Sequence, residues 1–117
     1  MVDQVSVKRV YDPPGDEDGT RMLIDRMWPR GVRRAYWPGN AWRPDLAPST
    51  ELRRTFHGDD VDFERFATQY RDELDANPAI EGVLAIEGTL TLVTAARNPQ
   101  RSHAAVLAAY LVERAGR

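Results

Sequence analysis

Short apolar stretches separated by polar turns run along this chain, and three of them are typical of β-strands. Residues 5–10, 20–25 and 89–95 are rich in β-branched and other apolar side chains and are bounded by polar or turn-forming residues. Residues 12–19 contain two prolines, two glycines and four acids. We expect them to form a turn-rich loop, because proline cannot donate to a strand ladder and glycine accepts positive φ.

Helical periodicity dominates the rest of the chain. One face of a helix is indicated by four residues at intervals of three and four: Phe63, Phe66, Tyr70 and Leu74. Ser49 is a suitable N-cap for a short helix that begins directly after it and comes before the helix with this apolar face. Asn77-Pro78 and Asn98-Pro99 each combine a capping residue with a proline, which favours helix starts at both places. The last helix is expected over residues 99–114.

The order of these elements predicts an α/β fold. Helical crossovers between strands require at least two parallel strands, and only about three strands are visible. Residues 32–48 hold several prolines and large aromatic residues, so we expect an ordered but irregular segment there. With 117 residues, the chain suits one compact domain with a small, mainly parallel sheet covered by helices.

Composition excludes several kinds of chemistry. The chain has no cysteine, so disulfides, thiolate zinc sites and cysteine nucleophiles are excluded. It contains no histidine pair at metal-ligand spacing, no GxGxxG run and no Walker A loop, and we expect neither a metal nor another cofactor. Neither a leader peptide nor an apolar run of membrane-spanning length is visible, so a cytoplasmic location without a membrane partner is expected.

Charge is distributed unevenly, although the net charge is only −2. Residues 21–54 hold eight arginines against three acids, whereas residues 55–88 hold two arginines against nine acids. Fifteen of the sixteen basic residues are arginine, whose planar fork suits carboxylate and phosphate groups. The base composition of the genome is an alternative source of the same bias toward arginine.

Polar side chains follow two of the expected strands at the point where each strand ends. Arg26, Trp28 and Arg30 follow the second strand, and Arg97 follows the third. Ligands of open α/β sheets bind outside the carboxyl ends of the strands, so these residues predict a site for an anion. The structural alternative is that Arg26 or Arg30 pairs with an acid such as Asp25.

Three further residues complete the candidate site. His103 is a candidate proton-transfer group, or else a half-buried histidine bonded to the backbone. Asp25 is a candidate catalytic acid, although orienting Arg26 or Arg30 is the favoured role. Asn98 would place free backbone N–H groups of the last helix beside an anion, and plain capping is the competing explanation. Trp28, Trp37 and Trp42 suit either stacking on a flat ligand or packing, with packing favoured.

The most specific run is Asp25-Arg26-Met27-Trp28-Pro29-Arg30-Gly31, and with it the chain resembles the DUF488 family. The resemblance is to its branch of small bacterial YeaO-like proteins, and it also covers residues 8–12, 45–53 and 90–111. It implies a compact α/β domain and no established reaction. Where the family often has an acid after the last strand's arginine, Asn98 stands here.

Three classes of function remain open at this point. The leading hypothesis is a protein that binds a small anionic or phosphorylated ligand at the strand ends, with or without catalysis. The alternative is a nucleic-acid-binding or regulatory module using residues 21–54, which the negative net charge disfavours. A third is self-association through the oppositely charged segments, and the sequence leaves the oligomeric state open.

Overall fold

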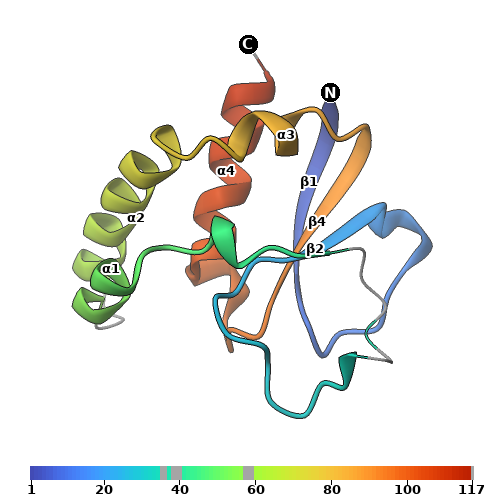
Figure 1. Ribbon diagram of the computed structural model, residues 1–117, viewed down its shortest axis with the longest axis horizontal. Coiled ribbons are helices and arrows are strands. Elements are labelled where there is room, and N and C mark those ends of the chain that lie inside the picture. The colour runs from blue at the N-terminus through green and yellow to red at the C-terminus, as the bar shows by residue number, and fades with distance from the viewer. Residues whose placement is uncertain (35–36, 38–40, 57–59, 117) are drawn as a thin grey trace.

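Four parallel strands form the sheet of this protein, in the order β1-β4-β2-β3. The computed structural model describes residues 1–34, 37, 41–56 and 60–116. Its strands are β1 (Val2–Arg9), β2 (Thr20–Leu23), β3 (Ala41–Trp42) and β4 (Gly88–Thr94). β4 pairs in parallel with both β1 and β2, so their carboxyl ends meet at one edge (Figure 1). The expected parallel pairing of the strands over residues 20–25 and 89–95 is confirmed, because these are β2 and β4.

Four α-helices accompany the sheet: α1 (Thr50–Thr55), α2 (Asp60–Asp75), α3 (Ile80–Leu84) and α4 (His103–Ala115). Ser49 caps α1, as its position predicts, by accepting a hydrogen bond from the Leu52 N–H. The stripe on α2 is also confirmed, because Phe66, Tyr70 and Leu74 are all buried. Figure 1 shows α4 between the sheet and α2, with both chain termini at the end away from the strand carboxyl ends.

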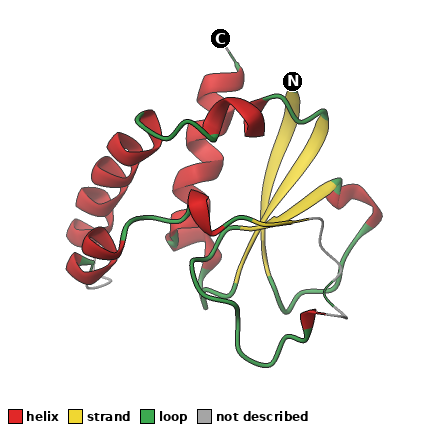
Figure 2. Cartoon of the chain, in the orientation of Figure 1, coloured by secondary structure: helices red, strands yellow, loops and turns green. Residues whose placement is uncertain are grey.

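The two faces of the sheet are covered differently. Leu90 and Leu92 of β4 belong to the main core together with residues of all four helices. Val93, which points to the other face, packs with Leu23, Val10 and three tryptophans, of which Trp42 belongs to β3. Helices thus cover one face, and irregular segments cover the other, as the green loops in Figure 2 indicate. The α/β class is confirmed, although helices cover only one side.

A ten-residue loop, rather than a helix, connects the parallel strands β1 and β2. It contains the 3₁₀ helix η1 (Asp16–Asp18). The buried carboxylate of Asp18 contacts Lys8 of β1 at 2.8 Å and Arg21 of β2 at 2.5 Å. The Thr91 hydroxyl of β4 also donates to the Asp18 carbonyl. One residue therefore fastens the loop to three strands, which compensates for the missing helix.

Two boundaries differ from the sequence-based expectations. Residues 99–101 form the 3₁₀ helix η4 (Pro99–Arg101), and α4 begins only at His103. The Ser102 hydroxyl accepts from the Ala104 N–H, whereas the Asn98 side chain makes no capping bond. The expectation that Asn98 caps the last helix is therefore wrong, because Ser102 fills that position. Gly88, one residue before the expected start of the third strand, begins β4 with φ +81°.

The irregular segment after β2 contributes one short strand that the sequence did not indicate. β3 pairs with β2 at the sheet edge, and the 3₁₀ helix η3 (Pro44–Leu46) follows. The side chain of Leu46 is fully buried, and its carbonyl accepts a hydrogen bond from the Tyr70 hydroxyl. The segment is thereby fixed against α2. None of the helices in the described residues is both long and apolar enough to cross a membrane.

Candidate functional site

A cavity of about 700 Å³ opens at the carboxyl ends of β2 and β4. Its walls come from three parts of the chain: residues 25–29 after β2, residues 47–56 around α1, and residues 94–103 between β4 and α4. Phe66 of α2 adds to the wall beside α1. The cavity therefore lies where parallel strands of an α/β sheet usually place a ligand.

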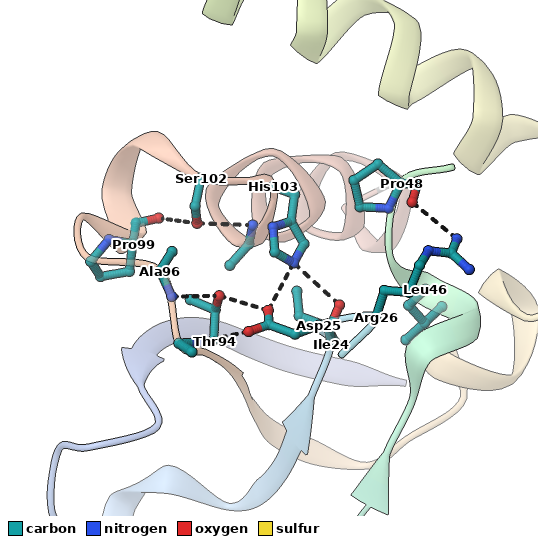
Figure 3. Close-up of polar contacts among 12 residues, drawn as sticks. Ile24, Asp25, Arg26, Leu46, Pro48, Thr94, Ala96, Pro99, Ser102 and His103 are labelled. Atoms are coloured by element: carbon teal, nitrogen blue, oxygen red, sulfur yellow. Dashed lines mark hydrogen bonds and ion pairs between the residues drawn. The ribbon is translucent and has the colours of Figure 1, made fainter. Parts of the chain in front are cut away.

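Asp25 lies at the centre of the polar contacts in this cavity (Figure 3). Its Oδ1 accepts hydrogen bonds from the Thr94 hydroxyl at 2.7 Å and from His103 Nε2 at 3.1 Å. Its Oδ2 accepts from the Ala95 N–H at 2.8 Å. Burial raises the pKa of Asp25, but hydrogen bonds from His103, Ala95 and Thr94 outweigh burial and hold the pKa below its usual value. Asp25 is a carboxylate at neutral pH.

His103 is held in one orientation by its contacts. Its Nε2 lies 3.1 Å from Asp25 Oδ1 and 3.2 Å from the Ile24 carbonyl oxygen, as Figure 3 shows. Both neighbours are acceptors, so Nε2 must carry a proton. The neutral ring then offers Nδ1 as an acceptor, and the charged ring offers it as a donor. The expected role of Asp25 in orienting Arg26 or Arg30 is wrong, because Asp25 orients His103.

Local sequence explains why His103 can reach Asp25. The Ser102 hydroxyl donates to the Pro99 carbonyl at 2.7 Å and caps α4, so His103 is the first residue of that helix. Thr94 ends β4, and its hydroxyl accepts from the Ala96 N–H while donating to Asp25. The turn after β4 is fixed on both sides of the Asp25–His103 pair.

The arginines at the cavity differ in their contacts. Arg26 donates to the Pro48 carbonyl at 3.0 Å, and its guanidinium points away from the Asp25 carboxylate (Figure 3). The Nε atom of Arg26 is buried without a hydrogen-bond partner. Arg97 is exposed at the rim, and no side chain or carbonyl of the described residues pairs with it. No acid of the described residues neutralises either arginine.

Two more arginines line the cavity. Neither was predicted from its position after a strand. Arg53 comes from α1, and its side chain has no polar partner within the described parts of the chain. Arg101 comes from η4 and lies over the Phe63 ring, 5.0 Å from its centroid. The spacing of Arg97 and Arg101 around the Asn98-Pro99 turn could have indicated Arg101. Nothing in the sequence indicates that α1 brings Arg53 to the same place.

Of the remaining predicted site residues, two line the cavity and one does not. Asn98 and Trp28 line the cavity, whereas Arg30 is exposed and is not among the lining residues that the structure describes. The backbone carbonyl of Arg30 accepts a hydrogen bond from the Tyr11 hydroxyl. Asp25, Arg26, Trp28, Arg97, Asn98 and His103 are thus brought together, and their role in ligand binding stays a prediction.

Comparison with known proteins identifies the family. A family model described as the inactive DUF488-N3 subclade matches residues 4–117. The chain belongs to this DUF488 subclade. The DUF488 protein is 43% identical to the uncharacterized protein YeaO of Escherichia coli over 92% of its own length and 96% of YeaO. It is 42% identical to the uncharacterized protein Rv3073c of Mycobacterium tuberculosis, over 92% of its own length and 93% of that relative. No solved structure matches the chain.

The tryptophans of this DUF488 protein are mainly packing residues. Trp28 lies edge to face with both Trp37 and Trp42, at centroid distances of 5.8 and 5.4 Å. Trp42 Nε1 donates to the Asp25 carbonyl, and Trp28 Nε1 donates to that of Val32. The indoles therefore stabilise the loop that carries Asp25. Trp28 alone among them also lines the cavity in the described residues.

Nucleophilic and metal chemistry find little support in the residues that the structure describes. The hydroxyls of Thr94 and Ser102 in the cavity each donate one hydrogen bond and accept another within the protein. No cluster of three or more metal-ligating side chains occurs among these residues. What the site offers is positive charge, apolar surface and one oriented imidazole.

Proposed function

We propose that this DUF488 protein binds a small organic anion in the cavity at the carboxyl ends of β2 and β4. The observation that carries the proposal is the imbalance of charge in the described lining. In that lining the guanidiniums of Arg26, Arg53 and Arg97 have no acidic partner among the described residues, and the same lining holds one carboxylate. That carboxylate, Asp25, already accepts three hydrogen bonds. A concave site with uncompensated positive charge attracts anions strongly.

The cavity's surroundings favour an organic ligand over a simple ion. A volume of about 700 Å³ lies in the range of pockets that enclose small organic molecules. Apolar side chains line the part of the cavity formed by α1, α2 and residues 25–29, namely those of Met27, Phe56 and Phe66. An inorganic ion would leave this apolar surface in contact with water.

Binding without turnover is the form of the function that we favour. The two hydroxyls named above are occupied by hydrogen bonds, and the chain has no cysteine. The matching subclade is described as inactive, which is consistent with a site that retains recognition and lacks a reaction. In this function Asp25 orients His103, and His103 contacts the ligand.

The nucleic-acid alternative has less support. Within residues 21–54, Arg43 is paired with Asp45 at 2.8 Å, and Arg34 lies over the Trp28 and Trp42 rings. These contacts occupy groups that phosphate recognition or base stacking would need. The cavity arginines, by contrast, are grouped in a concave surface that suits a small ligand.

The proposal is tested by thermal unfolding and calorimetric titration with a panel of anions at constant ionic strength. The panel holds inorganic phosphate, an aromatic carboxylate and an aromatic phosphate. At least one organic anion should raise the unfolding midpoint, because ligands that bind only the folded state stabilise it. Arg53→Ala should weaken binding about tenfold, a loss expected for a charged hydrogen bond.

A neighbouring arginine provides the matched control. Arg54 lies on the same helix and is exposed, but it is not among the described cavity residues. Arg54→Ala should therefore leave the affinity unchanged. Equal losses in the two variants would mean that general surface charge is responsible. If no organic anion stabilises the wild-type protein beyond the effect of sodium chloride, the proposal is wrong.

A further inference from the structure

The cavity has an aromatic wall and a polar wall, and a ligand that fills it contacts both. One wall is aromatic, because Phe56 and Phe66 stack with their ring centroids 4.8 Å apart and an interplanar angle of 24°. The other wall is the turn after β4, which carries polar and cationic side chains. A ligand that satisfies both has a flat apolar part and a charged part.

Unused donors are concentrated in the polar wall. The guanidinium of Arg97 and the side-chain amide of Asn98 follow one another in the chain, and neither has a partner among the described residues. His103, on the same wall, has its Nε2 committed to Asp25 and Ile24, which leaves Nδ1 for a ligand. Three neighbouring side chains can therefore contact one group.

The amount of charge decides between the common anionic groups. A carboxylate has one negative charge and two oxygens, whereas a phosphate monoester has a charge between −1.5 and −2 at neutral pH and three strong acceptor oxygens. Arg53 and Arg97 both lack a counter-charge in the described residues. A dianion with three acceptor oxygens matches this set better than a carboxylate does.

We infer that the ligand is a phosphate monoester whose organic part carries a flat ring. Its phosphate would lie on Arg97, Asn98 and His103, and its ring would lie against Phe56 beside Phe66. The inference rests on the proposed anion-binding function and narrows it to one chemical class. Phosphate supplies most of the charge recognition, and the ring supplies stacking, which tolerates different ring types because every flat ring has a π-face.

Calorimetric titration with three matched probes tests this inference. The probes are 1-naphthyl phosphate, 1-naphthylacetate and methyl phosphate, each at pH 7.5 and constant ionic strength, a pH at which the phosphate is about fully dianionic. 1-Naphthyl phosphate should bind about tenfold or more tightly than each of the other two. One comparison isolates the phosphate, and the other isolates the ring.

Two variants assign the contacts. Arg97→Ala should weaken both phosphates. Phe56→Leu should weaken the two naphthyl probes and leave methyl phosphate unchanged, because leucine keeps the wall apolar but removes the ring. The ratio of the two phosphate affinities is the readout for Phe56→Leu, so a general loss of stability would not imitate the effect. Arg54→Ala should change none of these values.

The possible outcomes distinguish a failure of this inference from a failure of the proposed anion-binding function. If 1-naphthylacetate binds as tightly as 1-naphthyl phosphate, the phosphate is not selected, and the inference fails while anion binding stands. If methyl phosphate binds equally well, the ring requirement fails in the same way. If no probe binds, and no other anion of the panel does, the proposed function fails as well.

Discussion

Asp25 accepts a hydrogen bond from His103 Nε2 across 3.1 Å, and this contact joins the end of β2 to the first turn of α4. The same carboxylate accepts from Thr94 and Ala95 at the end of β4. A single side chain therefore connects the ends of β2 and β4 with the start of α4. The geometry of the site depends on Asp25 remaining charged.

Replacing Asp25 by asparagine should destabilise the protein. The amide group places a donor where the carboxylate accepts from Thr94, Ala95 and His103, so at least one of these donors loses its partner. The free energy of unfolding in urea should fall by about 1–3 kcal/mol. Asp45→Asn is the control, because its pair with Arg43 is largely exposed and should cost about 1 kcal/mol or less. Similar losses in both variants would contradict a central role for Asp25.

Arg97→Ala should leave the stability of the fold intact. The side chain is exposed, and none of the described residues pairs with it. We therefore expect the free energy of unfolding to stay within about 0.5 kcal/mol of the wild-type value, or to rise slightly because cations at the cavity repel one another. Urea denaturation measures this. A large loss would show that Arg97 is a structural residue, and its loss of ligand binding could then not be attributed to a direct contact.

Acidification should weaken the loop between β1 and β2. The pKa of Asp18 is lowered from 3.8 to about 2, first by the hydrogen bond from Lys8 and then by that from the Gly15 N–H. Because the folded pKa lies below the unfolded value, the contribution of Asp18 is complete above about pH 4 and is lost as the pH falls toward 2.

Urea unfolding across this acidic range measures the effect. The free energy of unfolding should decrease as the pH falls, and the decrease should be smaller in Asp18→Asn. Some decrease should remain in that variant, since the pKa of Asp25 is also lowered in the folded protein. An unchanged pH dependence in Asp18→Asn would contradict this assignment.

Gly19 should tolerate no side chain. Its φ is +64°, and an added Cβ would overlap the carbonyl oxygen of Thr89 on the neighbouring strand. Gly31 also has a positive φ, +78°, but open space surrounds its Cβ position. Gly31→Ala should therefore cost only the backbone strain of about 1–2 kcal/mol. Gly19→Ala should cost clearly more, as measured by urea denaturation, and equal costs would contradict the close approach of β4.

Much of the site could be predicted because it depends on strand ends. Arg26, Trp28 and Arg97 directly follow β2 and β4, and the pairing of these strands brings them to one cavity. Arg30 lies only two residues beyond Trp28, yet it is exposed and outside the described lining. Positions next to a strand end are thus predictable, and positions further along a loop are not.

The parts that could not be predicted depend on tertiary packing. Arg53 reaches the cavity because α1 is held in place by Glu73, which accepts from the Ser49 N–H and hydroxyl. Glu73 is one of several acids of α2, and no local pattern distinguishes it from the others. The pairing of Asp25 with His103 is similar, since either arginine beside Asp25 was an equally good partner in the sequence.

The position of β4 in the sheet has a consequence for how this protein is made. β4 is the last strand to be synthesised, and it lies between β1 and β2, which do not pair with each other. While the ribosome is still translating the first 87 residues, β1 has no partner strand, and β2 has only the two-residue strand β3. The sheet must therefore be completed late, by insertion of one strand between two others, and such nonlocal pairing makes folding slow. The cavity, whose walls follow β2 and β4, forms only when that insertion is complete.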